Sequence, residues 1–529
     1  FADISGNISG LAFEDMTLDL SSYGGSSVGL IGHLQGSGSD LNFTNITIKG
    51  GAATEAGCIG TTEGSLTGIT LHNIKVTARG QYIGGLTGLA RGTVADVTLT
   101  GDVTYDESSG NTTYGSEVIN EGNYEGTGGL IGMPYGALEN LKVSGLHVKG
   151  YTYVGGVSGR INENTNQNIQ VGDENLTTAD GAKVPFGVFV EGRTYISGVA
   201  SRGTSGGYST TVNYFKNVKV QNVRISASND GAYGIGAVCQ VEDSEVSGCD
   251  IYAATSHAAG VVRDWNTVYR TTVKDTKISS GNNVGGIGTY GLSAVDCTVS
   301  GCTITGNKYV GGVLGLSYNS TINSTGVVDS FIGTENASYV GGLVGGNYQD
   351  SATQTFAVVY NSFCKDSTVQ AASAAGGIIG YARGGNYESN YSNATVIASE
   401  NAGGFAGLAD GYIMNSDARR RLQLKDFYFR GTVEAKLQNA GGLFGTYNQP
   451  RNSDGTYYLG ENVPTQINAD TVKTDGSIVD GGKVYIQNII LAPDTVTANL
   501  SSTAAQVANL VATVDNKQVI QSEIGTEAG

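Results

Sequence analysis

The chain has 529 residues, of which 82 are glycine and only 5 are proline, and charged residues make up 15% of the total. Its 30 basic and 47 acidic residues give a net charge of −17, which opposes binding to nucleic acid or to anionic membrane surfaces. No apolar run approaches the roughly 20 residues that a membrane-spanning helix needs, so we expect no membrane insertion. Because the chain opens at Phe1 without an initiator Met or an apolar leader, we expect a mature chain or a fragment.

A glycine-rich motif recurs from near the beginning of the chain to beyond residue 440, and its clearest copy is Tyr-Val-Gly-Gly-Leu-Val-Gly at 339–345. The shortest spacings between successive copies are about 24 to 28 residues, and a unit of that length cannot bury an apolar face alone. The copies therefore predict repeats that stack. Aligned on the second glycine, they lie at Gly29, Gly57, Gly85, Gly129, Gly156, Gly198, Gly236, Gly260, Gly286, Gly312, Gly342, Gly377, Gly404 and Gly442.

A second motif alternates with the first, with the pattern apolar, any, Asn or Asp, apolar, any, apolar. In a regular strand the inward positions are two apart, but here the first and the last apolar residues lie on opposite parities. The side of the strand on which the apolar side chains lie must therefore change at the Asn or Asp. These are the residue types that best tolerate a left-handed backbone conformation. The clearest predicted corners of this kind are Asn45, Asn73, Asp96, Asn140 and Asp426.

The glycine motif predicts a further corner, because the absence of Cβ atoms allows the backbone to bend tightly. The clearest predicted glycine corners are Gly85, Gly129, Gly156, Gly312, Gly342, Gly377, Gly404 and Gly442. Three short strands joined by corners make one coil of a parallel β-helix. We therefore predict an all-β, right-handed parallel β-helix of about 14 coils, with roughly three short strands in each coil.

The predicted solenoid covers residues 1–492, and residues 493–529 form a C-terminal helical cap or linker. The helix is expected from the spacing of Leu500, Ala504, Val507, Val511 and Val514, with a capping box at 503–506. Polar insertions are expected at about 100–127, 160–194 and 446–482. Insertions at a corner project without breaking the stack and are where solenoids often carry binding function, although neutral decoration is an equal alternative.

The Gly-Leu-x-Gly core of the first motif, as in Gly85-Leu-Thr-Gly88 and Gly442-Leu-Phe-Gly445, resembles the GLUG repeat. That repeat occurs in large bacterial surface proteins, in adhesin-like proteins and in the non-catalytic N-terminal part of streptococcal immunoglobulin A1 metalloproteases. The resemblance spans roughly Gly29 to Gly445 and weakens over 195–290, where copies lose glycines. It implies a repeat class and says little about the ligand.

Catalytic constellations are not visible in the sequence. The four histidines, His33, His72, His147 and His257, form no His-Glu-x-x-His pair, and no nucleophile elbow or P-loop is present. The recurring Asp and Asn residues fall at corners, where a structural role is the favoured interpretation. We expect no catalytic residues, metal or cofactor, although carboxylates on separate coils could converge in a carbohydrate-active enzyme.

Tyrosine recurs three residues before the aligned glycine. The copies at Tyr153, Tyr195, Tyr233, Tyr309 and Tyr339 are the candidate ligand-binding residues, with a further copy at Tyr82. Stacked tyrosines on neighbouring coils form an aromatic ladder that either stabilises the fold or binds flat sugar faces or a protein.

Six cysteines are present, and their positions on the predicted coils argue against a disulfide framework. Cys249 and Cys302 lie two coils apart, beyond disulfide reach, which leaves Cys297 and Cys302 as the only plausible pair. We expect mostly free, buried thiols that act as small apolar residues.

Together these features predict an extracellular, non-enzymatic module of a bacterial surface or secreted protein that binds a host surface protein or glycan or acts as a stalk. The alternatives are the non-catalytic substrate-binding region of a larger secreted metalloprotease, a carbohydrate-active β-helix enzyme, and a self-associating filament subunit.

Overall fold

The computed structural model describes residues 1–162, 164–203, 213–264, 267–347, 357–410, 422–448, 484–491, 494–498, 506–508, 511–514 and 517–518. Within these ranges the regular structure is entirely β-strand, and no helix that could cross a membrane is found there. Most strands belong to long parallel sheets, which is consistent with a β-solenoid. The chain divides into two compact units, Phe1–Asn266 with Val273–Lys277, and Thr267–Thr272 with Ile278–Gly529.

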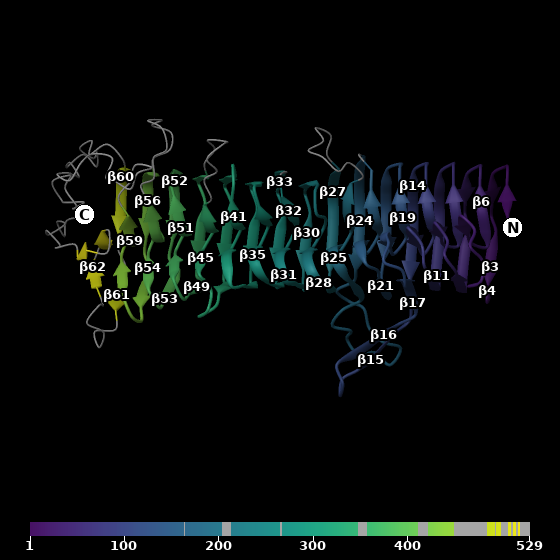
Figure 1. Cartoon of the computed structure of the whole chain (residues 1–529), viewed down its shortest axis with the longest axis horizontal. Helices are drawn as coiled ribbons and strands as arrows, with labels where there is room; N and C mark the ends of the chain where they lie inside the picture. The colour runs from purple at the N-terminus through teal and green to yellow at the C-terminus, as the bar shows by residue number, and fades with distance from the viewer. Residues whose placement is uncertain are drawn as a thin grey trace. The chain divides into compact units, whose positions relative to one another are not determined.

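In unit 1, strands from successive repeats lie side by side and pair in parallel (Figure 1). The inward positions stay in register from one repeat to the next, so that like residues stack on like. One such column is Ile69, Val97, Leu141, Ile169 and Val218, whose side chains are at most 1% exposed. Burying each of these side chains stabilises the fold by roughly 1.5–3 kcal/mol.

A smaller parallel sheet in unit 1 contains the residues that follow the glycine pair. Its seven strands, in order, are β1 (Asp3–Ile4), β6 (Ile31–Leu34), β10 (Ile59–Thr62), β13 (Thr87–Ala90), β19 (Ile131–Pro134), β23 (Ser158–Ile161) and β26 (Ala200–Gly203). The strands that precede the glycine motif include β5 (Ser27–Val28), β9 (Glu55–Ala56), β12 (Tyr82–Gly84), β18 (Glu125–Gly128), β22 (Thr152–Gly155) and β25 (Val188–Ser197). The repeat therefore folds sharply between these two sets.

Unit 2 repeats the same arrangement. Its strands after the glycine pair are β36 (Gly288–Tyr290), β41 (Leu314–Ser317), β46 (Val344–Asn347), β51 (Ile379–Arg383), β55 (Ala406–Asp410), β59 (Phe444–Asn448) and β63 (Val511–Val514), which pair in parallel in that order. The strands before the pair include β40 (Lys308–Gly311), β45 (Tyr339–Gly341), β50 (Ala374–Gly376), β54 (Asn401–Gly403) and β58 (Asn439–Gly441).

The predicted Asn and Asp corners adopt the left-handed conformation. The φ angle is 53° at Asn45 and Asp426 and 54° at Asn73, Asp96 and Asn140. In β20 (Leu138–Val143) the buried residues are Leu138, Leu141 and Val143, so the side-chain direction flips at this corner.

The corner side chains also bond to one another along the stack. The Nδ2 atom of Asn140 donates to Asp96 Oδ1 at 2.8 Å, and Asn168 Nδ2 donates to Asn140 Oδ1 at 2.9 Å. Asn217 continues the series by donating to Asn168 at 3.2 Å. Asn168 itself has a φ of 57°, although the sequence pattern did not identify a corner there, because Asn166 stands where the motif has an apolar residue.

The glycine corners serve a purpose other than the predicted one. None of the anchor glycines predicted as corners has a positive φ, so conformational freedom is not what selects them. Instead, a Cβ on Gly129 would lie 2.0 Å from the carbonyl oxygen of Gly156, and one on Gly342 would lie 2.1 Å from that of Gly377. Glycine is required because the backbone of the next repeat passes directly against the corner. The same contact with the next anchor's oxygen is made by Gly85, Gly156, Gly312, Gly377 and Gly404, the last of which approaches Gly442.

The predicted C-terminal helix is not confirmed, since the described residues of that stretch form strands. Strand β62 (Gln506–Ala508) pairs with β58, and β63 pairs with β59. The register places Val507 opposite Ala440, Ala508 opposite Gly441 and Val511 opposite Phe444. Ala508 therefore stands where the preceding repeat has the first glycine of its pair.

Two of the predicted insertions leave the stack over shorter ranges than expected. In the first, the hairpin of β15 (Val103–Asp106) and β16 (Asn111–Tyr114) leaves it, and in the described part of the second residues 173–187 do so. The third, 446–482, falls almost entirely outside the described residues.

Replacing Gly129 with alanine tests the close backbone approach. The added Cβ would overlap the Gly156 carbonyl, so Gly129→Ala should lower the free energy of unfolding by about 3 kcal/mol, as overpacking does. Gly24→Ala is the matched control, because no atom lies within 4 Å of a Cβ built there, and it should change stability by less than about 0.5 kcal/mol. Urea unfolding followed by circular dichroism measures both. Equal effects of the two variants would contradict the account.

Candidate functional site

The candidate tyrosines of unit 1 form a stacked pair. The ring centroids of Tyr153 and Tyr195 lie 5.5 Å apart with an interplanar angle of 18°, so one face of each ring covers the other. The guanidinium group of Arg160 lies 5.2 Å from the Tyr153 centroid, and that of Arg263 lies 5.1 Å from the Tyr195 centroid. These contacts occupy ring faces within the protein. The pair is therefore better suited to stabilising the stack than to holding a flat sugar ring.

Unit 2 carries the corresponding set. Tyr309 and Tyr339 stack at 5.3 Å, and Tyr339 also stacks at 5.3 Å on Tyr381, which comes from β51 after the glycine pair. The Nζ atom of Lys308 lies 4.9 Å from the Tyr309 centroid. Tyr339, before one glycine pair, thus packs against Tyr381, after the next one. This contact stabilises the bend between the two sets of strands on its outer side.

The placement of Tyr233 in this ladder was wrong. Parallel pairing puts Tyr233 opposite Ser197 and Ala259, so Gly234, and not Gly236, is equivalent to Gly198. The position equivalent to Tyr195 is a glycine, Gly231. Tyr233 instead takes the place of the first glycine of the pair, and its side chain is fully buried. Burial raises its pKa well above the ordinary value, and no ligand can reach it from outside.

An Asp–His pair lies close to this irregular corner. His257 Nδ1 and Asp230 Oδ1 are 2.8 Å apart, and the hydroxyl of Ser256 donates to the same oxygen at 2.9 Å. In a hydrolytic triad the serine gives its proton to the imidazole, whereas Ser256 directs it to the carboxylate. The arrangement fits a structural hydrogen-bonded pair that fixes the position of Asp230.

Two insertions that are far apart in the sequence combine into one lobe, defined here as residues 103–114 and 173–187. Strands β15 and β16 form an antiparallel hairpin that projects away from the stacked strands of unit 1 (Figure 1). Val103 and Tyr114 from the hairpin pack with Val184 from the second insertion, and Tyr105 and Leu176 pack against them. The lobe therefore has a small apolar core of its own.

Aromatic contacts hold the lobe against the stack. The His147 ring stacks on Phe189 at 5.1 Å with a 5° interplanar angle, and the Tyr114 ring lies 6.1 Å from His147. Tyr114 also donates a 3.0 Å hydrogen bond to the carbonyl oxygen of Phe186. His147 is itself held within the stack, where its Nε2 atom and Lys149 Nζ each lie 3.1 Å from Glu191 Oε1. The lobe is thus held in a defined orientation.

The tip of the lobe is exposed and polar. Asp106 accepts hydrogen bonds from the Ser108 and Ser109 hydroxyls, both at 2.7 Å, and these bonds lower its pKa to about 2. Thr104 and Thr113 face each other across the hairpin and are exposed. A rigid, exposed polar hairpin can contact a partner with little loss of conformational entropy.

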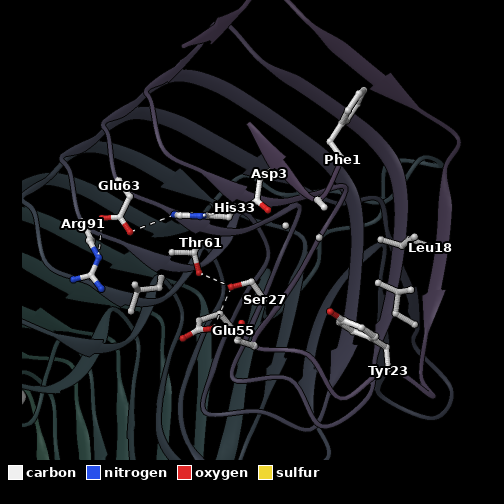
Figure 2. A pocket seen from close by; sticks show the side chains of 16 residues that line it. Phe1, Asp3, Leu18, Tyr23, Ser27, His33, Glu55, Thr61, Glu63 and Arg91 are labelled. Atoms are coloured by element: carbon white, nitrogen blue, oxygen red, sulfur yellow. Dashed lines mark hydrogen bonds and ion pairs between the residues drawn. The ribbon is translucent and has the colours of Figure 1, made fainter. Parts of the chain in front are cut away.

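A cavity of about 620 Å³ opens at the first repeats of unit 1 (Figure 2). Polar residues from β1, β5, β6, β9 and β10 line one part of it, and Phe1, Leu18, Leu20 and Tyr23 line another. Ser27 in β5 and Glu55 in β9 are in register with Tyr82 in β12, so they occupy the position that tyrosine has in the ladder. The cavity lies where the tyrosine of the ladder is replaced by these smaller or charged side chains.

Neither the histidines nor the cysteines form a metal site in the described part of the chain, where no cluster of three or more His, Cys, Asp or Glu side chains is suitably placed. All six cysteines are free and buried, as predicted, and this includes Cys297 and Cys302. Burial raises the pKa of Cys249 to about 12 and that of Cys297 to about 11, so both thiols stay protonated and unreactive.

In comparisons with known proteins, no family model matches this chain, and no curated protein matches its sequence.

The sequence pattern did not show that the two insertions meet or that a cavity lies near the first repeats. The long intervals in the glycine spacing located the insertions but gave no contact between them. A usable signal was the alternation of apolar residues inside otherwise polar segments, at Val103, Tyr105, Leu176 and Val184. The cavity had a weaker signal, the absence of tyrosine at Ser27 and Glu55.

The ion pair at the base of the lobe makes a pH-dependent contribution to stability. The hydrogen bond from His147, which outweighs burial, lowers the pKa of Glu191. Because its pKa is lowered, the Glu191 carboxylate stabilises the folded state at pH values above the ordinary glutamate pKa of about 4.3. This stabilisation is lost as the pH falls below that value.

Glu191→Gln should therefore be less stable than the wild type by about 1 kcal/mol at pH 7, and the difference should shrink toward zero by about pH 3. Urea unfolding at each pH gives the free energies. Glu174→Gln, on the exposed surface of the lobe, serves as the control and should show a smaller difference. A difference for Glu191→Gln that stays constant from pH 7 to pH 3 would contradict this role.

Proposed function

We propose that the chain is an extracellular structural and adhesive module of a bacterial surface or secreted protein, built as a right-handed parallel β-helix of about 14 GLUG-type coils. In this proposal the coils act as a scaffold, and the lobe of residues 103–114 and 173–187 contacts a host surface protein or glycan. The module has no catalysis of its own.

The lobe carries this proposal. A neutral insertion needs no apolar core, yet two insertions from different repeats share one, and Tyr114 of the hairpin packs against His147 of the scaffold. Binding residues in repeat proteins are commonly placed on such excursions, while the repeats keep them in position.

The polar groups of the coils support the same division of roles. Corner side chains such as Asn140 use their hydrogen-bonding capacity on the next corner, and the ladder tyrosines use their faces on one another. The recurring corner residues and tyrosines of the coils thus bind to one another along the stack, which is suited to a stalk. The GLUG-like motifs point to the same class of surface proteins.

The test is a binding screen of the full chain against glycan arrays and immobilised host surface proteins. In the variant Thr104→Lys/Thr113→Lys, two charges are added to the exposed face of the hairpin, opposite its core. We expect this variant to lose at least about tenfold in affinity for any ligand found, with an unchanged melting temperature, because a charge placed at a contact is costly to desolvate.

The matched control is Thr70→Lys/Thr98→Lys, since these two threonines also face each other on neighbouring strands but lie outside the lobe. It should keep its affinity within about twofold of the wild type. Equal losses in both variants, or no loss in the lobe variant, would remove the lobe from the proposal.

A further inference from the structure

The cavity at the first repeats of unit 1 has two chemically different walls. One wall is apolar and consists of Leu18, Leu20 and Tyr23, with Phe1 at its rim. The other wall carries three carboxylates, those of Asp3, Glu55 and Glu63, which point toward the cavity in Figure 2. A ligand that fits both walls has an apolar body and a group that binds carboxylates.

Two of the three carboxylates already have basic partners. Glu63 Oε2 lies 2.9 Å from Arg91 Nε, and its other oxygen lies 3.4 Å from His33 Nε2. The opposite nitrogen of His33 lies 3.3 Å from Asp3 Oδ1. These contacts form a chain of alternating acidic and basic side chains along one side of the cavity, so a new cation would have to compete for Asp3 and Glu63.

Glu55 differs from the other two. Its Oε2 accepts a hydrogen bond of 3.3 Å from the Ser27 hydroxyl, which is itself 2.8 Å from the Thr61 hydroxyl. Within the described ranges Glu55 forms no ion pair, and burial raises its pKa. The Ser27 hydroxyl and the more weakly acting Arg91 favour the charged form of Glu55, but burial has the larger effect, so a cation in the cavity would stabilise that charge further.

The Glu55 position also explains why a cavity exists here. The equivalent residue on the next repeat is Tyr82, and further along the unit Tyr153 and Tyr195 fill this place with stacked rings. At Ser27 and Glu55 no ring is available, and the space beside the strands of the smaller sheet stays open. A cavity of about 620 Å³ is within the usual range for small-ligand sites.

We propose that this cavity binds a primary ammonium group on a short aliphatic stem, with the Glu55 carboxylate accepting from the ammonium and Leu18, Leu20 and Tyr23 packing against the stem. The Thr61 and Ser27 oxygens supply the remaining acceptors for its three N–H donors. A divalent metal is a poorer fit, since no metal-binding cluster of His, Cys, Asp or Glu occurs in the described residues. The site goes beyond the proposed adhesive function, because it uses no residue of the lobe.

The experiment is isothermal titration calorimetry of the full chain with two probes that share a stem. Nα-acetyl-lysine methylamide carries the ammonium, and Nα-acetyl-norleucine methylamide lacks it. We expect the lysine derivative to bind at least about tenfold more tightly, and Glu55→Gln to lose that preference, because an amide cannot pair with the cation. Glu139→Gln, which lies outside the cavity, should bind like the wild type.

Cadaverine as a third probe distinguishes the sources of the ammonium. Tighter binding of cadaverine assigns the site to free diamines, and tighter binding of the lysine derivative assigns it to lysine side chains.

A second measurement needs no variant: binding to the wild type should weaken as the pH falls from 7 to about 4.5, because Glu55 becomes protonated. Equal affinity for the lysine and norleucine probes, no binding of either, or full binding by folded Glu55→Gln would overturn the proposal.

Discussion

The structure depends on how closely the backbones of successive repeats approach each other at the glycine corner. At Gly129 the carbonyl oxygen of Gly156 occupies the space that any Cβ would need, and the same contact recurs from one anchor to the next. Since the strands of neighbouring repeats must pair at a fixed spacing of about 4.8 Å, this approach cannot be relaxed at one corner without disturbing the ladders on both sides. The motif recurs because the contact recurs.

The other corners solve a different problem with different chemistry. At Asn140 the backbone needs a left-handed conformation, and the side chain that tolerates it also bonds to Asp96 and Asn168 on the neighbouring repeats. Outside the core, stacked tyrosines join the strands that precede the glycine pair to the strands that follow it. Most of the residues that stand out in the sequence thus serve stacking, which directs the search for function to places where the pattern is interrupted. The lobe interrupts it by insertion, and the cavity at Glu55 by loss of a ring.

Much of this fold could be predicted because each repeat meets the same local requirement. The flip at Asn140 follows from parity alone, and so does the burial of Leu138, Leu141 and Val143. The prediction was wrong at Tyr233, where pairing with the neighbouring strands, and not the local sequence, decides which glycine is equivalent to the anchor of the next repeat. Tyr233 was aligned with Tyr195 because Gly236 looked like an anchor, but pairing with Ser197 and Ala259 makes Gly234 the equivalent glycine. The predicted C-terminal helix is not confirmed, since residues 506–508 and 511–514 are strands and Ala508 stands where the motif has a glycine.

The candidate sites were less predictable than the fold. The contact between Tyr114 and Val184 joins residues 70 positions apart in the sequence, and no local pattern encodes it. The cavity depends on which side chain is missing from a column, which becomes visible only when the register of Ser27, Glu55 and Tyr82 is known. Sequence periodicity therefore describes the scaffold well and the departures from it poorly.

The central claim is that backbone geometry at the corners, and not ligand chemistry, selects the recurring residues. A substitution series at Asn140 tests it most directly, with urea unfolding as the measurement. Glycine accepts a φ of 54° but loses the side-chain hydrogen bonds, whereas alanine loses the bonds and also pays about 1 kcal/mol or more for the left-handed conformation. The account predicts a stability order of wild type, then Asn140→Gly, then Asn140→Ala. An alanine variant as stable as the glycine variant would contradict it.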